Sequence, residues 1–226
     1  MRFKAIIFDV HKTLVDDSGF PRERIWKLMR EAGAKFEMTA YYELYDSLTP
    51  QLFNWVALSP FIPIREIHRR RLKIFYERFQ VSRNIDDDVN FLWQEMKTGA
   101  IYADVPQMLE TVSQKHSVGL LSNADKDDPL IEILNESSHR FDVIITSEHV
   151  GAYKPAPMMF ERMLNALNCR NTEVVMVGDS LMSDVLGAHQ CDIPVVWINR
   201  TRKPWLPKYP KPDFEISNMQ DLLRIL

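Results

Sequence analysis

The sequence contains little cysteine and no long hydrophobic run. Cys169 and Cys191 are the only cysteines in 226 residues and lack metal-type spacing, so we expect free thiols in a reducing cytoplasm. No apolar run approaches about 18 residues, the length that a membrane-spanning helix needs. The opening Met-Arg-Phe-Lys leads into a strand pattern with an acidic residue, so no signal peptide is predicted. These absences favour a cytoplasmic protein without membrane association.

The sequence also lacks an excess of charge of either sign. It has 28 Lys and Arg against 31 Asp and Glu, a formal charge of -3, which gives no attraction to nucleic acid or anionic membranes. Repeats and low-complexity segments are absent as well. With 46% hydrophobic residues the chain can bury a large core, so a folded protein with a small-molecule partner is expected. Its oligomeric state is not indicated.

The N-terminal apolar segment, Ala5 to Phe8, runs directly into Asp9, and His11 and Thr13 follow. A continuous apolar run is typical of a buried parallel strand, and chemistry on open α/β sheets gathers at the carboxyl ends of such strands. By itself, an Asp after a strand is more often a turn residue or a helix cap than a nucleophile.

Residues 16–97 are predicted to form a helical insertion. Ile25, Leu28 and Met29 recur with helical spacing, and Gly33 is placed to end that helix. Three further apolar segments follow, at 41–55 with Pro50 interrupting it, at 64–79 and at 89–96. No run in this region requires a strand.

Beyond Gly99, apolar runs alternate with helical periods, which is the signature of βαβ units. Asp128-Pro129 is predicted to start one of the helices, with Asp128 accepting from its free amides. The predicted fold class is therefore α/β, a doubly wound parallel sheet with a small all-helical domain. The strands are expected at 5–8, 117–121, 143–145, 174–177, 193–198 and 214–216.

Chemically useful side chains follow several of these strands. Parallel strands with right-handed crossovers bring their carboxyl ends to one edge, so residues far apart in sequence can converge there. Each residue alone has a structural interpretation as a turn, a solvated side chain or a cap. As a set they supply a nucleophile, hydrogen-bond donors, a cation and metal-binding carboxylates, which phosphoryl transfer requires. They are Asp9, Ser122, Asn123, Lys154, Asp179 and Asp184.

Four short motifs stand at these strand ends: Phe8-Asp9 with Thr13-Leu14, Leu121-Ser122-Asn123, Lys154-Pro155, and Val177-Gly178-Asp179-Ser180 with Asp184. In this order and spacing they resemble the signature motifs of the haloacid dehalogenase superfamily. The likeness covers essentially the whole chain and implies a Rossmann-like core of residues 1–15 and 98–226 with a helical cap domain at 16–97. Such a cap would close over the site, exclude water and contact a small phosphorylated substrate.

This resemblance implies a nucleophile and a metal site. Asp9 would attack a phosphoryl group to form an aspartyl-phosphate, which divides one difficult displacement into two easier ones. Lys154 would neutralise charge around Asp9 and the phosphoryl group. The implied cofactor is Mg2+. Its implied ligands are Asp9, the backbone carbonyl of His11, Asp179 and Asp184, the last directly or through water.

The substrate-binding residues that the resemblance implies are Thr13, Ser122 and Asn123. Ser122 and the Asn123 amide would bind the transferring oxygens, while Thr13 would help to hold the loop after Asp9.

One position departs from the pattern of the superfamily's phosphatases, which carry a second Asp two residues after the nucleophile and commonly a Gly after that. Here these positions are His11 and Lys12. With an ordinary pKa of about 6.5, His11 could replace the Asp as acid and base in a working, slower phosphatase. Two alternatives stay open: a metal-independent 2-haloacid dehalogenase, and a degenerate protein that binds phosphate ligands or regulates without turnover.

Other residues receive weaker assignments. The run Arg69 to Arg71 is expected on a solvated helix face, with an anionic substrate patch as the alternative. The loop at 17–20 is the expected place for a specificity contact, because it is close in sequence to Asp9. No role is assigned to the remaining histidines, and most insertion aromatics are expected in its core. These residues are His68, His116, His139, His149 and His189, and Trp26, Tyr41, Tyr42, Tyr45, Phe53 and Trp55.

Overall fold

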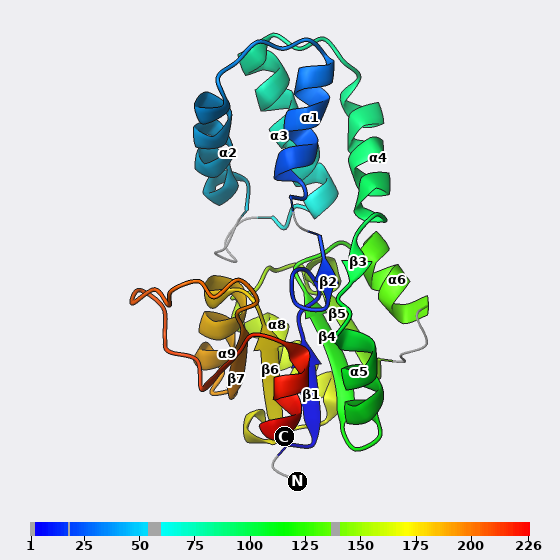
Figure 1. Cartoon of the computed structure of the whole chain (residues 1–226), viewed down its shortest axis with the longest axis vertical. Coiled ribbons are helices and arrows are strands. Elements are labelled where there is room, and N and C mark those ends of the chain that lie inside the picture. Colours follow the sequence, from blue (N-terminus) through cyan, green and yellow to red (C-terminus); the bar gives the residue numbers. More distant parts are fainter. Residues whose placement is uncertain (1–2, 18, 54–59, 137–140) are drawn as a thin grey trace.

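The computed structural model describes residues 3–17, 19–53, 60–136 and 141–226. Within these residues six strands form one parallel sheet in the order β5-β4-β1-β6-β7-β8 (Figure 1). The α/β fold and all six predicted strands are confirmed. The strands are β1 (Ala5–Phe8), β4 (Ser117–Ser122), β5 (Val143–Thr146), β6 (Val174–Gly178), β7 (Val195–Ile198) and β8 (Phe214–Ile216).

Helices cover both faces of the sheet, and this explains why β1 is apolar throughout. Ile6 and Phe8 belong to one buried apolar cluster, while Ala5 and Ile7 belong to the cluster on the opposite face. The first cluster includes residues of α5 (Val105–Ser113), α6 (Pro129–Glu136) and the closing turn η3 (Met219–Arg224). The second includes α8 (Pro157–Leu167), η2 (Leu181–Val185) and α9 (Leu186–Gln190).

Four further helices gather above the carboxyl edge of the sheet (Figure 1). They share a third apolar cluster, separate from the two that flank the sheet. This separate core supports the predicted cap domain at 16–97, and the domain boundaries stay a proposal. The helices are α1 (Arg22–Glu31), α2 (Met38–Leu52), α3 (Ile64–Phe79) and α4 (Ile85–Met96).

Local sequence signals set several helix ends. Gly33, with a φ of +78°, follows α1 in the left-handed conformation that glycine adopts without steric cost. Asp128 Oδ1 accepts from the Leu130 amide at 2.9 Å, so the predicted start of α6 is confirmed. Asn84 Oδ1 accepts from the Asp86 amide at 2.9 Å and starts α4. The prediction placed that helix four residues too late, because it followed apolar spacing and ignored the cap.

Other details differ from the predictions. Pro50 does not interrupt its segment, since α2 continues to Leu52. The two-residue strands β2 (Val15–Asp16) and β3 (Ala100–Ile101) form an antiparallel pair that is too short to leave a sequence pattern. Trp55 and His139 lie outside the described residues. Within them, Cys169 and Cys191 are free thiols, and no helix is both long and apolar enough to cross a membrane.

Candidate active site

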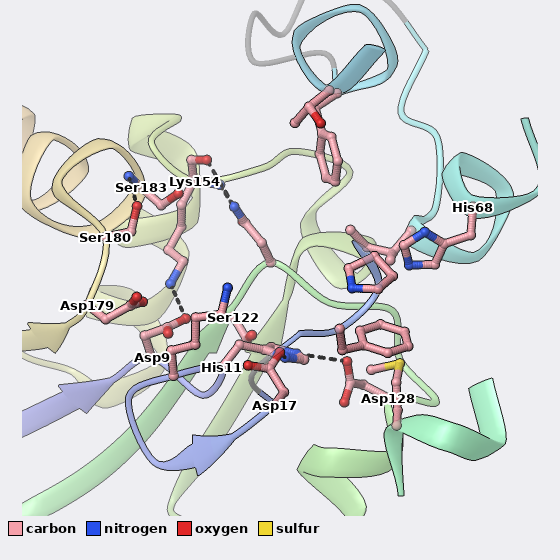
Figure 2. Close-up of a pocket in the computed structure, with 18 of the residues that line it drawn as sticks. Asp9, His11, Asp17, His68, Ser122, Asp128, Lys154, Asp179, Ser180 and Ser183 are labelled. Carbon is pink, nitrogen blue, oxygen red and sulfur yellow. Dashed lines mark hydrogen bonds and ion pairs between the residues drawn. The ribbon is translucent and has the colours of Figure 1, made fainter. Parts of the chain in front are cut away.

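The carboxyl ends of three central strands open into a cavity of about 370 Å³ between the sheet and the α1–α4 helices. Asp9 follows β1, Ser122 ends β4, and Asp179 follows β6; all three line this cavity (Figure 2). Lys154 and Asp184 also line it. The parallel topology therefore brings together residues that are up to 175 positions apart in the chain.

Lys154 is the cation at the centre of this group, and its side chain is only 1% exposed. Its Nζ donates to Asp9 Oδ1 at 2.7 Å and to Asp184 Oδ1 at 2.6 Å. Burial alone lowers the pKa of Lys154, but Asp184 and Asp9 outweigh burial and raise that pKa, so the ammonium keeps its charge.

Asn123 fixes the backbone of Lys154. The Lys154 amide donates to Asn123 Oδ1 at 2.7 Å, and Asn123 Nδ2 donates to the Lys154 carbonyl at 3.1 Å. This pair of hydrogen bonds ties the loop after β5 to the end of β4. The Asn123 side chain therefore positions the lysine, which the sequence did not indicate.

Three carboxylates form the acidic side of the cavity. One carboxylate oxygen from each of Asp9, Asp179 and Asp184 lies within 4.8 Å of the other two. Burial, followed by the charges of Asp9 and Asp184, raises the pKa of Asp179, and burial also raises the pKa of Asp184 despite Lys154. Lys12 and Lys154 both act against this rise at Asp179, but two ammonium groups do not balance three carboxylates. This set of hard oxygen donors fits a divalent cation such as Mg2+.

His11 lies at the cavity but makes contacts that the sequence did not reveal. Its Nδ1 is 2.9 Å from Asp17 Oδ2, and its Nε2 is 3.1 Å from Asp128 Oδ2 (Figure 2). Burial lowers the pKa of His11, but Asp128 and Asp17 reverse this effect and hold the pKa well above its ordinary value. The ring is therefore an imidazolium that donates to both carboxylates, and neither nitrogen is free to accept a proton.

The other predicted site residues occupy different environments. Ser122 is fully buried at the cavity, and its Oγ has no hydrogen-bond partner among the described residues. Thr13 is fully buried and lies outside the cavity lining, where its carbonyl accepts from Arg200 Nη2 at 3.0 Å. Thr13 thus lies where it can hold the loop after Asp9, and its assignment as a substrate-binding residue stays a prediction. Lys12 has a φ of +61°, a conformation that a Gly at this position would adopt without strain.

The arginine run of α3 divides between two environments. Arg70 is exposed and Arg69 is half-buried, and both pair with Glu66, as predicted for a solvated face. For Arg71 that prediction is wrong, because this side chain is buried and lines the cavity. Its position, four residues after Ile67 and four before Phe75 on the apolar face, was the available signal.

Contacts across the cavity join the helices to the sheet. Asp125, in the loop after β4, accepts from the amides of Ile64 at 2.6 Å and Arg65 at 2.8 Å, and so caps α3 from 61 and 60 residues away. Trp93 Nε1 donates to the Asp127 carbonyl at 3.3 Å. The Tyr153 hydroxyl donates to the Ile62 carbonyl at 2.5 Å. These contacts therefore attach the helices to the sheet domain next to the cavity.

Known proteins resemble this chain over nearly its full length. N-acylneuraminate-9-phosphatase of Homo sapiens is 24% identical over 234 residues, which covers 100% of this chain and 94% of that relative. A crystal structure of a HAD phosphatase from Thermococcus onnurineus has a TM-score of 0.69 and 25% identity, covering 99% and 97% of the two chains. A 2-haloacid dehalogenase from Pseudomonas syringae pv. Tomato DC3000 has a TM-score of 0.72 at 21% identity with the same coverage, a likeness of fold alone.

A family model described as haloacid dehalogenase-like hydrolase matches residues 3–192, most of the chain. The parallel sheet agrees with this match, and so does the convergence of Asp9, Lys154 and Asp179 at its carboxyl edge. The chain therefore belongs to the haloacid dehalogenase-like hydrolases.

Proposed function

We propose that the protein is a Mg2+-dependent phosphatase that hydrolyses small phosphate monoesters through an aspartyl-phosphate on Asp9. The observation that carries this proposal is the contact of Lys154 with both Asp9 and Asp184 beside Asp179. This arrangement provides a nucleophilic carboxylate, a cation that can neutralise phosphoryl charge, and a set of carboxylates whose negative charge a metal cation would balance. The phosphatase relative, at 24% identity, agrees with this chemistry.

In the first step, a carboxylate oxygen of Asp9 forms a bond to phosphorus while the ester P–O bond breaks and the leaving oxygen takes a proton. Asp9 Oδ1 is held by Lys154, so Oδ2 is the oxygen that we expect to attack. The Ser122 hydroxyl and the backbone amide of Asn123 would donate to the phosphoryl oxygens. A bound Mg2+, with Asp9, the His11 carbonyl, Asp179 and Asp184 as candidate ligands, would neutralise charge on the phosphoryl group. In the second step, water hydrolyses the aspartyl-phosphate and releases phosphate.

His11 is proposed as the proton carrier at the position of the usual second Asp. Its ring must exchange the bond to Asp17 or Asp128 for one to the leaving oxygen, and this requirement predicts slow turnover. The same two bonds favour a second candidate function. A protein that forms the aspartyl-phosphate but hydrolyses it poorly would act as a phosphate-responsive binding protein.

The dehalogenase alternative receives less support. In that reaction Asp9 attacks carbon, and no metal is used. Lys154 pairs with Asp9 and Asp184, and without a metal ion the further negative charge of the acidic set near the nucleophile would stay unbalanced. A likeness of fold to dehalogenases does not distinguish the two reactions.

The proposal is tested by phosphate release from a broad panel of monoesters, with Mg2+ and with EDTA. We expect Mg2+-dependent release that Asp9→Asn abolishes. Release only after His11→Asp would instead support the binding protein, because the missing proton carrier would then be the single defect. Chloride release from 2-chloropropionate in EDTA would overturn the proposal in favour of the dehalogenase.

A further inference from the structure

The end of the cavity far from the carboxylates is built by α2 and α3 and contains a buried cation. Arg71 is 1% exposed, and none of the described carboxylates forms an ion pair with it. Its Nη1 donates to the Tyr45 hydroxyl at 3.1 Å and its Nη2 to Thr49 Oγ1 at 3.4 Å, while the guanidinium lies 4.4 Å from the centre of the Tyr45 ring. All of these partners are neutral.

His68 lies beside Arg71 and lines the same end of the cavity. Figure 2 shows His68 across the pocket from Asp9 and Asp179. Its Nδ1 is 3.5 Å from Arg71 Nη1, a guanidinium nitrogen that can only donate, so the ring proton belongs on Nε2. Burial and Arg71 lower the pKa of His68 to about 3, which keeps the ring neutral.

The two unpaired side-chain atoms of α3 at this end of the cavity are both hydrogen-bond donors. Arg71 Nε and His68 Nε2 are both buried without a partner among the described residues. The Tyr45 hydroxyl accepts from Arg71 and keeps its own proton to donate. A buried cation surrounded by unsatisfied donors is unfavourable until an anion with several acceptor oxygens joins it.

Other arginines of the chain show what Arg71 lacks. Arg200 makes two hydrogen bonds to the Asp104 carboxylate, at 2.9 and 3.1 Å. Arg83 is likewise paired, through its Nε, with Asp88 at 2.8 Å. The absence of such a carboxylate at Arg71, inside the cavity that holds the nucleophile, indicates that the ligand supplies it.

We propose that Arg71, His68 and Tyr45 form a carboxylate-binding subsite, so that the substrates are phosphate monoesters of hydroxy acids. The phosphoryl group then lies at Asp9 and the carboxylate at Arg71. A carboxylate matches the single positive charge of the subsite, whereas a second phosphate would leave negative charge unbalanced among neutral donors. This inference rests on the proposed function and deepens it.

The test compares three pairs of esters of increasing length that differ in the carboxylate. The pairs are phosphoserine with phosphoethanolamine, 3-phosphoglycerate with glycerol 3-phosphate, and 6-phosphogluconate with glucitol 6-phosphate. In at least one pair we expect the acid to have the higher kcat/KM. Arg71→Gln should lower that kcat/KM by about 100-fold, mainly through KM, because it removes the charged partner of a buried carboxylate.

Three controls separate the subsite from other effects. Arg70→Gln changes the neighbouring exposed arginine and should preserve the preference, and Arg71→Lys should restore part of it. Hydrolysis of p-nitrophenyl phosphate, which has no carboxylate, should be equal in wild type and Arg70→Gln, and Arg71→Gln should lower it by much less than the 100-fold expected for the acid. Circular dichroism and thermal unfolding show whether the Arg71→Gln variant is folded. Propane-1,3-diol bisphosphate should not replace the acid.

Equal kcat/KM within all three pairs, or a preference for the bisphosphate, would overturn the subsite. Failure of the proposed function gives a different result, because p-nitrophenyl phosphate is then not hydrolysed by any variant. Calorimetric binding of the same pairs to Asp9→Asn requires no turnover. Asp9→Asn should still bind the acid of at least one pair more tightly than its partner without a carboxylate. Equal affinity within all three pairs would contradict the subsite even if the protein is not a phosphatase.

Discussion

The two ends of the cavity hold buried charges of opposite sign, and the residues that the structure describes balance neither end. At the sheet edge, the three carboxylates of Asp9, Asp179 and Asp184 outnumber the ammonium groups of Lys154 and Lys12. At the α3 end, the guanidinium of Arg71 has neutral partners only among the described residues. Because unbalanced buried charge destabilises a fold, its presence at both ends indicates sites shaped for ligands of the complementary charge.

The largest stability effect is expected at the sheet edge. Lys154→Met leaves Asp9 and Asp184 buried without their cation and should lower the free energy of unfolding by about 3–5 kcal/mol at neutral pH. Mg2+ should recover part of this loss, since it supplies positive charge to the same carboxylates. Thermal unfolding with and without Mg2+ measures both effects. Lys35→Met, at an exposed lysine, is the control. A loss that Mg2+ leaves unchanged would contradict this view of the acidic set.

At the α3 end of the cavity, removing the buried charge is expected to stabilise the protein. Arg71→Met removes a buried charge that has no carboxylate, so it should raise the free energy of unfolding by about 1–4 kcal/mol. Arg200→Met is the matched control, because Arg200 is already paired with Asp104 and its loss should destabilise the protein. Chemical denaturation of both variants gives the comparison. Equal destabilisation would show that Arg71 is a structural arginine.

A smaller effect on stability is expected at Asp125, which joins the loop after β4 to the start of α3. Asp125→Ala removes the side chain that caps α3 and should cost about 1 kcal/mol of stability. Asn84→Ala removes the cap of α4 within the helical group and should cost about the same. Only Asp125→Ala should speed hydrogen exchange at the Ile64 and Arg65 amides. Equal exchange in both variants would rule out Asp125 as the cap of α3.

The smallest effect concerns a paired arginine and depends on pH. Burial raises the pKa of Asp104, but Arg200 and the Met219 amide outweigh it and hold that pKa below its ordinary value. The stabilisation by Asp104 is therefore complete above about pH 4 and is lost as pH falls through the lowered pKa. Asp104→Asn should cost about 0.5 kcal/mol at pH 7, and the difference from wild type should disappear in acid. Unfolding curves at several pH values test this, and a gap independent of pH would contradict it.

Much of the fold could be predicted because its signals are local. The apolar run from Ala5 to Phe8 indicated a strand buried on both faces, and the rule that parallel strands share a carboxyl edge brought Asp9 and Lys154 together. The site roles of these residues stay predictions. Contacts between distant residues left no sequence signal. Asp128, for example, is 117 residues from His11 and was recognisable only as a helix cap.

Arg71 shows a different limit of sequence reasoning. Its two arginine neighbours made a solvated face the natural expectation, although helical spacing placed Arg71 with Ile67 and Phe75. Spacing indicates that a side chain faces inward. It does not indicate whether that side chain meets a core or a cavity, because that depends on how the helices sit above the sheet.

The phosphorylated state of Asp9 is the most direct test of the central claim. Wild type is mixed with Mg2+ and a hydrolysable monoester, quenched rapidly in acid and measured as an intact protein by mass spectrometry. We expect a fraction of the protein to carry one phosphoryl group, located by peptide mapping on Asp9 and absent from Asp9→Asn. Phosphate release without any adduct, or an adduct that persists in Asp9→Asn, would contradict the account.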